Sequence, residues 1–516
     1  MLSALINLAR LARTGFVLTR EGVFGLADPA LLTPASRLGI SIMRLFERPD
    51  AGGESLARAF TRLGPTYVKL GQFLATRPDL VGMKNARNLE QLQDRMPSFD
   101  AAVAHATIEA TFGKPLAEIY DTIGEPVAAA SVAQVHKARV GDREVAVKVL
   151  RPGVRERFAR DVSAMVFAAK TAERLLPDAR RLRPVDSIAG FARSVQLETD
   201  LRLEASALSE LRENSLQDPG IRVPSVDWER TGRDVLTTEW IDGTPVADHA
   251  ALDAAGHDRK ALAVTAMQMF LRHALRDGFF HADMHQGNLF VDGAGRLVLV
   301  DCGIMGRLGF RERRFLAEIL FGFITRDYRR VSEVHFEAGY VPAHHSVDEF
   351  AQAIRAIGEP IHDRPAREIS MAKLLTLLFE ITALFDMQTR TELVLLQKTM
   401  IVVEGVSRSL DPDFDMWGAS EPVIRQWIER NLGPIGKVQE LGQGTRTLLQ
   451  QAARLPDMVE RGARVLAGLE AAAEKGFSLA PESVAAIGAA EAQRNRWATR
   501  ALWALVALGV YWLASP

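Results

Sequence analysis

Short apolar segments alternate with polar ones along the chain in a pattern that predicts both β-strands and helices. Residues 144–150, 235–240 and 297–300 are rich in valine, leucine and threonine and have the length of strands. The third of these follows an Asp-Gly turn at residues 292–293, which predicts a hairpin. Residues 188–213 have the length and polar spacing of a single helix. The pattern therefore predicts a mixed α+β fold.

Three acidic residues lie on the predicted helix at residues 188–213, namely Glu198, Asp200 and Glu204. Glu198 and Glu204 are six residues apart, so they point to different faces and cannot share one role. The residues alone leave open which of them has a partner elsewhere in the chain.

Another helix is predicted to begin at Gly64-Pro65, because proline is favoured in the first turn of a helix. Lys69 and Gln72 are three residues apart on this helix and therefore share a face. Gly71 lies beside them and would permit close packing against another element. The residues alone leave open whether Lys69 and Gln72 are solvated on a surface helix or face another element.

An acid and an amide precede the predicted hairpin, in the segment from His281 to Asn288, and a second acid follows it. Asn288 follows Asp283 by five residues, and Asp301 follows the strand at residues 297–300. A carboxylate at Asp283 would accept a hydroxyl proton or position the attacking group. Asn288 and Asp301 would hold magnesium against nucleotide phosphates. This order and spacing resemble the catalytic loop and the metal-binding Asp-x-Gly of kinases.

The other parts of a nucleotide site are expected upstream of this loop. Lys148, near the end of the strand at residues 144–150, resembles the strand lysine that kinases set against the α- and β-phosphates. An alanine-rich segment at residues 126–136 stands where a kinase has its glycine-rich loop, and alanine lacks the positive-φ freedom of glycine. The strand at residues 235–240, which contains Glu239, suits the hinge where adenine usually lies.

Taken together, these motifs resemble the UbiB/ADCK family of atypical kinases. They span roughly residues 60 to 310 in the family's order: Lys69-Leu70-Gly71-Gln72, the run from Ala128 to His136, Val147-Lys148, Glu198-Thr199-Asp200, the segment from His281 to Asn288, and Asp301-Cys302-Gly303. The resemblance implies a kinase-like fold with an N-terminal helical region folded over the nucleotide cleft. It also implies that Glu204 is the partner of Lys148, while Glu198 faces the helical region.

The resemblance further implies ATP and Mg²⁺ as cofactors, with Asp283 catalytic and Asn288 and Asp301 binding the metal. One departure is Gln286, which stands where proline is frequent in the family and changes the stiffness of the loop, since proline fixes φ. No Ala-Pro-Glu occupies the activation-segment position, so the usual platform for a peptide substrate is not visible. The residues predicted to contact the nucleotide are Val127, Ala128, Ala129, Ala130, Ser131, Val132, Ala133, Gln134, Val135, Lys148, Glu204 and Glu239.

Composition narrows the range of partners. Lysine and arginine number 63 against 64 aspartates and glutamates, so no global charge favours nucleic-acid binding. The single cysteine, Cys302, excludes an intramolecular disulfide and a cysteine-cluster zinc site, and it is interpreted as a small buried residue. The chain has no dinucleotide fingerprint and no redox cysteine pair, which argues against a hydroxylase.

Both ends of the chain have apolar segments that point to a membrane. Residues 1–20 combine apolar side chains with three arginines and contain no acid, which fits an interfacial helix or a helix packed on the domain. Residues 501–515 are uncharged and, extended to Trp497, approach the length of a membrane span. Arginines before this segment would keep the kinase-like domain on the cytoplasmic side, at a bacterial inner membrane. A terminal dimer contact is the alternative.

The predicted fold is α+β and bilobal, protein-kinase-like, with an N-terminal helical extension and a C-terminal membrane helix. Residues 329–348 are interpreted as connecting segments and residues 442–475 as an amphipathic helix. The predicted divisions are an N-terminal helical extension at residues 1–125, an N-lobe at 126–245, a C-lobe at 246–435, a helical region at 436–496 and an anchor at 497–515.

The predicted function is a membrane-associated atypical kinase or ATPase that supports ubiquinone (isoprenoid quinone) biosynthesis. The expected partners are membrane lipids or quinone precursors, and enzymes of ubiquinone biosynthesis or a second copy of the chain are also compatible. No nucleic acid is expected. Two alternatives stay open: a protein kinase acting on a protein substrate, and a nucleotide-binding scaffold without turnover.

Overall fold

The fold is described from a computed structural model, and the chain divides into two units, residues 1–429 and 430–516. The second unit contributes only residues 430–433 to the description, including the end of α19 (Met416–Asn431). The residues that the structure describes are 2–23, 47, 55–75, 81, 85, 88–89, 92, 97–175, 183–362, 381, 384–387 and 391–433.

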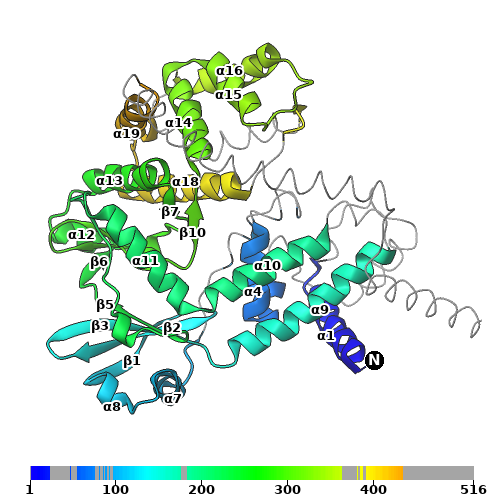
Figure 1. Cartoon of the computed structure of the whole chain (residues 1–516), viewed down its shortest axis with the longest axis vertical. Coiled ribbons are helices and arrows are strands. Elements are labelled where there is room, and N and C mark those ends of the chain that lie inside the picture. Colours follow the sequence, from blue (N-terminus) through cyan, green and yellow to red (C-terminus); the bar gives the residue numbers. More distant parts are fainter. Residues whose placement is uncertain are drawn as a thin grey trace, which may run out of the picture. The chain divides into compact units, whose positions relative to one another are not determined.

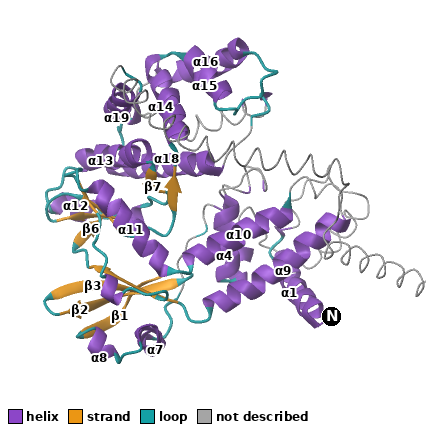
Figure 2. Ribbon diagram, in the orientation of Figure 1, coloured by secondary structure: helices purple, strands orange, loops and turns teal. Residues whose placement is uncertain are grey.

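Four antiparallel strands form the sheet of the N-terminal lobe, in the order β1-β2-β3-β5. Figure 2 shows β1, β2 and β3 of this sheet with α7 and α8 beside them. Their bounds are β1 Thr122–Ala129, β2 Ala133–Val140, β3 Arg143–Leu150 and β5 Val235–Glu239. The predicted strands at residues 144–150 and 235–240 are therefore confirmed. One face of the sheet buries Val147 and Val149 against α7 (Ala101–Phe112) and α8 (Leu116–Ile119). This apolar layer leaves the opposite face of the sheet for the functional side chains.

The predicted single helix at residues 188–213 is wrong, because two helices meet there. α10 (Pro184–Glu198) ends before Thr199, and α11 (Leu201–Ser215) begins after Asp200. The Asp200 side chain accepts a hydrogen bond from the backbone N–H of Arg202 and so caps α11. This capping competes with helix continuation, and the break sends Glu198 and Glu204 to different parts of the protein.

The accessory helical region is built from two separate segments of the chain (Figure 1). Its apolar core joins α3 and α4 to α9 and α10, and it also contains Leu150 of β3. α4 begins at Pro65, as the sequence predicted, and follows Gly64 with φ of 100°. The bounds of the helices not yet given are α1 Leu2–Arg20, α3 Ser55–Leu63, α4 Pro65–Ala75 and α9 Val154–Leu175.

Gly71 shows why α4 fits closely in this region. A Cβ atom added at Gly71 would lie 2.2 Å from Leu92 Cδ1 and 2.7 Å from Phe60 Cδ2, well inside contact distance. The close packing that the sequence predicted for Gly71 is confirmed.

The C-terminal lobe is mainly helical, with a small sheet in the order β4-β9-β8-β6 and a β10-β7 pair. The sheet bounds are β4 Ile221–Arg222, β6 Gly243–Pro245, β7 Phe279–His281, β8 Leu289–Asp292, β9 Leu297–Leu299 and β10 Met305–Arg307. The predicted hairpin at residues 292–293 is confirmed as the turn between β8 and β9. Helix α13 buries one side, which includes Ala266, Met269 and Phe270, and it packs against α18. The remaining helices are α12 His249–Ala254, α13 Arg259–Leu271, α14 Phe310–Thr325, α15 Tyr328–Glu337, α16 Val347–His362 and α18 Thr391–Leu410.

The prediction of connecting segments throughout residues 329–348 is wrong, because α15 occupies residues 329–337 and α16 begins at Val347. Asp327 caps the helix by accepting a hydrogen bond from the backbone N–H of Arg330. Val331 and Val334 are fully buried, so tertiary packing stabilises a helix whose polar residues concealed its pattern.

No helix among the described residues is long and apolar enough to cross a membrane. The predicted anchor at residues 497–515, the helical region at 436–496 and the amphipathic helix at 442–475 lie outside the described residues.

Candidate nucleotide-binding site

Lys148 lies at the centre of three charged side chains from separate elements. Its Nζ atom is 2.7 and 2.9 Å from the two carboxylate oxygens of Glu204, in the first turn of α11. The same atom is 3.2 Å from Oδ2 of Asp301, which follows β9. The structure thus brings together three predicted site residues that are 56 and 153 positions apart in the chain.

The charges of these three side chains depend on one another. Burial opposes the charge of Lys148, but the carboxylates of Asp301 and Glu204 outweigh it and raise the pKa of the lysine. Burial would raise the pKa of Asp301, yet Lys148 and the backbone N–H of Gly303 hold it well below its usual range. Burial raises the pKa of Glu204 to about 7 despite Lys148. Lys148 stays protonated throughout the neutral range, and Glu204 is the first of the two carboxylates to become protonated as the pH falls.

The predicted catalytic loop is fixed by its own hydrogen bonds. The backbone N–H of Asp283 donates to Nδ1 of the buried His281 at 3.0 Å. Because Nδ1 is the acceptor and burial lowers the pKa of His281, the neutral imidazole has its proton on Nε2. The Asn288 side-chain NH₂ donates to the backbone carbonyl of Asp283 at 3.0 Å, which turns the amide oxygen to other ligands. Asp283 and Asn288 are thereby held in a fixed relation.

The loop is joined to the Asp301 segment by strand pairing and to α18 by side chains. β7 pairs with β10, with His281 opposite Met305, so the two segments run side by side. The amide of Gln286 donates to Ser409 Oγ in α18 at 2.7 Å. Gln286 stands where the family often has proline. Its hydrogen bond to Ser409 restrains the loop in place of the fixed φ of a proline. Cys302 is buried and burial raises the pKa of its thiol, so the predicted small buried role is confirmed.

The oxygen donors of the site fit magnesium. The side chains of Asp283 and Asp301 are 35% and 44% exposed, so a bound ion or phosphate can reach both. The carboxylate of Asp301 and the amide oxygen of Asn288 are hard oxygen ligands, which magnesium prefers. These residues are therefore suitable to hold the metal that the sequence resemblance implied.

The alanine-rich segment forms the turn between β1 and β2. The backbone N–H of Ala130 donates to the carbonyl of Ala133, and the guanidinium of Arg151 donates to the carbonyl of Ala130. No residue between Val127 and Val135 has a positive φ, so this turn does not require glycine. Sequence reasoning missed Arg151, although its position directly after the Lys148 strand was a usable signal.

The predicted nucleotide-contact residues of this turn do not all face the same way. Val135 is paired with Lys148 across β2 and β3, so their side chains share the functional face of the sheet. Gln134 points to the opposite face, where its amide bonds to both the backbone N–H and the carbonyl of Phe99. The side chain of Gln134 therefore supports the turn from behind and is not directed toward the cleft.

Glu239 ends β5, but its side chain has protein partners. Its carboxylate is paired with Arg222 of β4 and accepts a hydrogen bond from the backbone N–H of Ser225. Its own backbone N–H donates to the carbonyl of Ser225. The position at the end of β5 still suits an adenine hinge, but the Glu239 carboxylate is used to join the two lobes.

Glu198 does not contact Lys148 and is instead paired with Lys69 of α4, at 2.9 Å between Nζ and Oε2. The two side chains are only 10% and 17% exposed, so this is a largely buried ion pair. Gln72 donates from its amide to the carbonyl of Leu92 at 3.5 Å. Arg155 of α9, another residue that sequence reasoning missed, donates to the carbonyl of Thr199 and fixes the break between α10 and α11.

The two lobes, the lysine–glutamate pair and the loop with Asp283 and Asn288 define a kinase-like fold. Residues 91–335 match the ABC1 atypical kinase-like domain, and residues 354–415 match the UbiB helical domain. The chain belongs to the UbiB family of ABC1 atypical kinase-like proteins. The predicted resemblance to UbiB/ADCK proteins is thereby confirmed.

Individual relatives agree with this placement. The chain is 39% identical over 422 residues to the probable protein kinase UbiB of Marinobacter nauticus, covering 80% of this chain and 77% of that protein. It is 38% identical over 499 residues to the probable protein kinase UbiB of Cellvibrio japonicus, covering 95% and 89%. The fold is similar to that of Rv3197 from Mycobacterium tuberculosis, solved as an erythromycin complex, with a TM-score of 0.50, 23% identity and coverage of 76% and 97%.

Proposed function

We propose that this protein is an ATP-dependent atypical kinase or ATPase that supports ubiquinone biosynthesis at a membrane. The observation that carries the proposal is the contact of Lys148 with both Glu204 and Asp301, beside a loop that fixes Asp283 and Asn288. The names of the UbiB relatives support the kinase class. Membership of the UbiB family supports the pathway.

In the proposed reaction, each residue has a role that its position permits. Asp301 and Asn288 would hold Mg²⁺, which when bound neutralises charge on the phosphate oxygens. Lys148 is kept charged by its carboxylate neighbours. It would bind the α- and β-phosphates of the nucleotide, which would compete with Asp301 for the lysine. Asp283 would orient the attacking hydroxyl or water and accept its proton.

A small-molecule acceptor or water fits this site better than a protein substrate. Only residues 304–309 separate Gly303 from the start of α14 at Phe310, and half of them form β10. This short connection leaves little chain for the activation segment on which protein kinases bind peptides. We therefore favour ATP hydrolysis or phosphorylation of a small molecule over the protein-kinase alternative.

The test of the proposal is magnesium-dependent release of phosphate from ATP, measured with and without liposomes and quinone-precursor mimics. We expect turnover that depends on Mg²⁺ and increases when membranes or precursor mimics are present. Transfer of phosphate to a defined protein in an Asp283-dependent manner would favour the protein-kinase alternative. Binding of MgATP without any phosphate release would favour the scaffold alternative.

Glycine in the alanine turn is expected to change nucleotide preference. No residue of this turn has a positive φ. Ala129→Gly or Ala130→Gly makes positive φ values accessible, so the backbone can approach the phosphates differently. We expect the ratio of ATP to ADP affinity, or the turnover, to change by about threefold or more, as about 0.7 kcal/mol would produce. Calorimetry and phosphate release measure these quantities.

Ala294→Gly, in the exposed β8–β9 turn, is the matched control and should leave both quantities unchanged. Unaltered affinities and turnover in both turn variants would remove this turn from the nucleotide site.

Helix α1 supports membrane association because part of its apolar surface is exposed. Asn7 and Thr14 turn toward the protein and bond to side chains of α9 and α4. Leu8 and Phe16 are 57% and 56% exposed on the other side, and Arg13 is exposed beside them. A helix with no acid, outward apolar side chains and arginines suits the interface of an anionic membrane.

Replacing Leu8 and Phe16 together by serine is expected to weaken binding to anionic liposomes about tenfold, because each apolar side chain contributes on the order of 1 kcal/mol of burial. Flotation measures the bound fraction, both in the full chain and in a chain ended after Gln493. The control replaces two other exposed apolar residues, Leu216 and Val264, by serine and should not change flotation. Equal flotation of the α1 variant and the control variant would exclude α1 as a membrane contact.

A further inference from the structure

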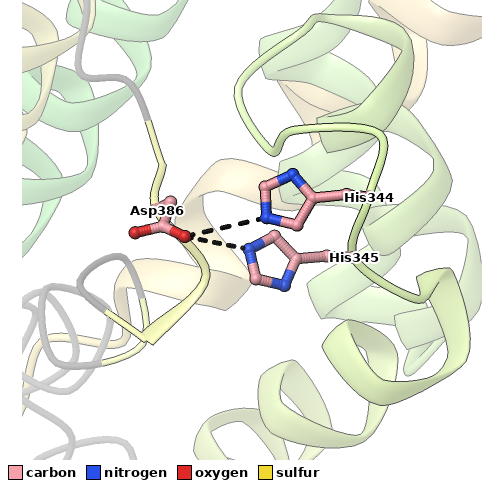
Figure 3. Close-up of side chains that lie close together, drawn as sticks. All are labelled: His344, His345 and Asp386. Atoms are coloured by element: carbon pink, nitrogen blue, oxygen red, sulfur yellow. Dashed lines mark hydrogen bonds and ion pairs between the residues drawn. The ribbon is translucent and has the colours of Figure 1, made fainter.

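Two adjacent histidines and an aspartate come together far along the chain from the nucleotide site (Figure 3). His344 and His345 lie in the connection between α15 and α16, and Asp386 lies in a turn before α18. The Nε2 atom of His345 is 3.3 Å from Oδ2 of Asp386, and the Nε2 atom of His344 is 3.8 Å from the same oxygen. Two imidazoles from one segment therefore converge on a single carboxylate oxygen from another.

The spacing of these atoms is close to that of a metal's ligands. All three potential ligand atoms lie within 4.8 Å of one another. Tetrahedral Zn²⁺ with bonds of about 2.0–2.1 Å holds neighbouring ligand atoms about 3.4 Å apart. The two distances to Asp386 need adjustments of a few tenths of an ångström. The two imidazole nitrogens lie within 4.8 Å of each other and must approach by up to about 1.4 Å, which rotation of the exposed His344 side chain supplies.

The surrounding structure fixes part of this cluster and leaves part of it open. The His345 ring packs against Phe385 at 5.2 Å between centroids, and its side chain is only 19% exposed. Phe385 in turn packs against the fully buried Phe350 of α16. The side chains of His344 and Asp386 are 67% and 68% exposed, so solvent can fill further positions around an ion. One ligand is anchored in the apolar core of the lobe and two are accessible.

The backbone at Asp386 is unusual in a way that serves this convergence. Its φ is 49°, in the left-handed region that residues other than glycine adopt at a cost. The buried side chain of Phe385 holds the turn in place. In this left-handed conformation, the carboxylate of Asp386 faces both histidines. A local conformation that is costly by itself is thus coupled to the position of the carboxylate.

We propose that His344, His345 and Asp386 form a binding site for a divalent transition metal, with Zn²⁺ as the preferred ion. Two imidazole nitrogens and one carboxylate oxygen are ligands that suit zinc, whereas magnesium and calcium require oxygen ligands. The site keeps at least one position open to water. Bound metal would cross-link the α15–α16 connection to the turn before α18. This site is independent of the proposed ATP chemistry, because none of its residues belongs to the nucleotide site.

The test uses the full-length protein after removal of any histidine tag and exposure to a chelator. Zinc is then titrated in competition with a chromophoric chelator, and Co²⁺ absorption provides a second readout of ligand geometry. We expect one tight Zn²⁺ equivalent and an increase in the melting temperature on adding it, because the ion binds the folded state. His344→Gln and Asp386→Asn should each weaken zinc binding at least about tenfold, as loss of one of three ligands implies.

His257→Gln is the matched control, a half-buried histidine in another part of the lobe, and should bind zinc as the unaltered protein does. Asparagine has the size of aspartate and adopts the left-handed backbone conformation as readily. The Asp386→Asn variant should therefore fold, which circular dichroism checks. The proposal is overturned if the unaltered protein binds no stoichiometric zinc, or if both ligand variants bind it as tightly as the control. Magnesium-dependent ATP turnover of the ligand variants separates this outcome from any failure of the proposed kinase chemistry.

Discussion

Replacing Asp301 by asparagine is expected to lower magnesium-dependent ATP turnover on the order of a hundredfold or more, since removing preorganised charge stabilisation has effects of this size. Asp301 is held ionised by Lys148 and Gly303 and is accessible enough to bind an ion. An amide keeps the size of the side chain but loses the negative charge that would bind magnesium and pair with Lys148. MgATP affinity by calorimetry and phosphate release under saturating ATP measure the loss.

Asp142→Asn is the control for this experiment, since Asp142 lies exposed in the turn between β2 and β3. It makes the same chemical change outside the site and should retain full activity. Circular dichroism should show that both variants are folded. Wild-type affinity and turnover in Asp301→Asn would contradict the kinase-like assignment of this site.

Replacing Lys69 by methionine is expected to destabilise the protein by about 3 kcal/mol, because removing one partner of a buried ion pair leaves the other charge unpaired. Lys69 and Glu198 are largely shielded from solvent and join α4 to the end of α10. The apolar core around this pair includes Val132 and Ala133 of the alanine-rich turn, so its loosening should reach the nucleotide site. Urea unfolding gives the free energy of unfolding, and limited proteolysis reports opening of the accessory helices.

Two further variants separate the charge effect from a general loss of packing. Lys137→Met removes a lysine from an exposed pair with Glu144 and should cost less than about 1 kcal/mol, as surface pairs do. Lys69→Met combined with Glu198→Met removes both charges and should recover part of the stability lost by the single change. If the double variant loses the sum of the effects of Lys69→Met and of Glu198→Met, each measured alone, the pair is not coupled as the structure implies.

The chemistry of the site could be read from the sequence because its parts are local. Asp283 and Asn288 lie within one short loop, and Asp301 follows a strand whose apolar pattern is plain. Fixed spacing across a loop or a hairpin constrains side chains whatever the rest of the chain does. The same holds for the Lys148 strand and for the helix that starts at Pro65, both of which the structure confirms.

The local sequence could not predict which distant glutamate pairs with Lys148 and which with Lys69. Glu198 and Glu204 were placed on one helix, and only the resemblance to a family favoured Glu204 as the partner of Lys148. In the structure the Asp200 cap divides the helix, so Glu204 reaches Lys148 while Glu198 reaches Lys69. Helix propensity is a weak local preference, and a capping hydrogen bond combined with burial of Leu201 is enough to override it.

The α+β class, the strands that hold Lys148 and Asp301, and the loop of Asp283 and Asn288 all follow from the amino-acid sequence. Only the tertiary structure decided that Gln134 faces away from the cleft, that residues 328–337 are helical and that two histidines meet Asp386. Periodicity and spacing record interactions between residues close in the chain. Which face a strand residue presents, and which distant segment meets it, depends on burial summed over the whole lobe.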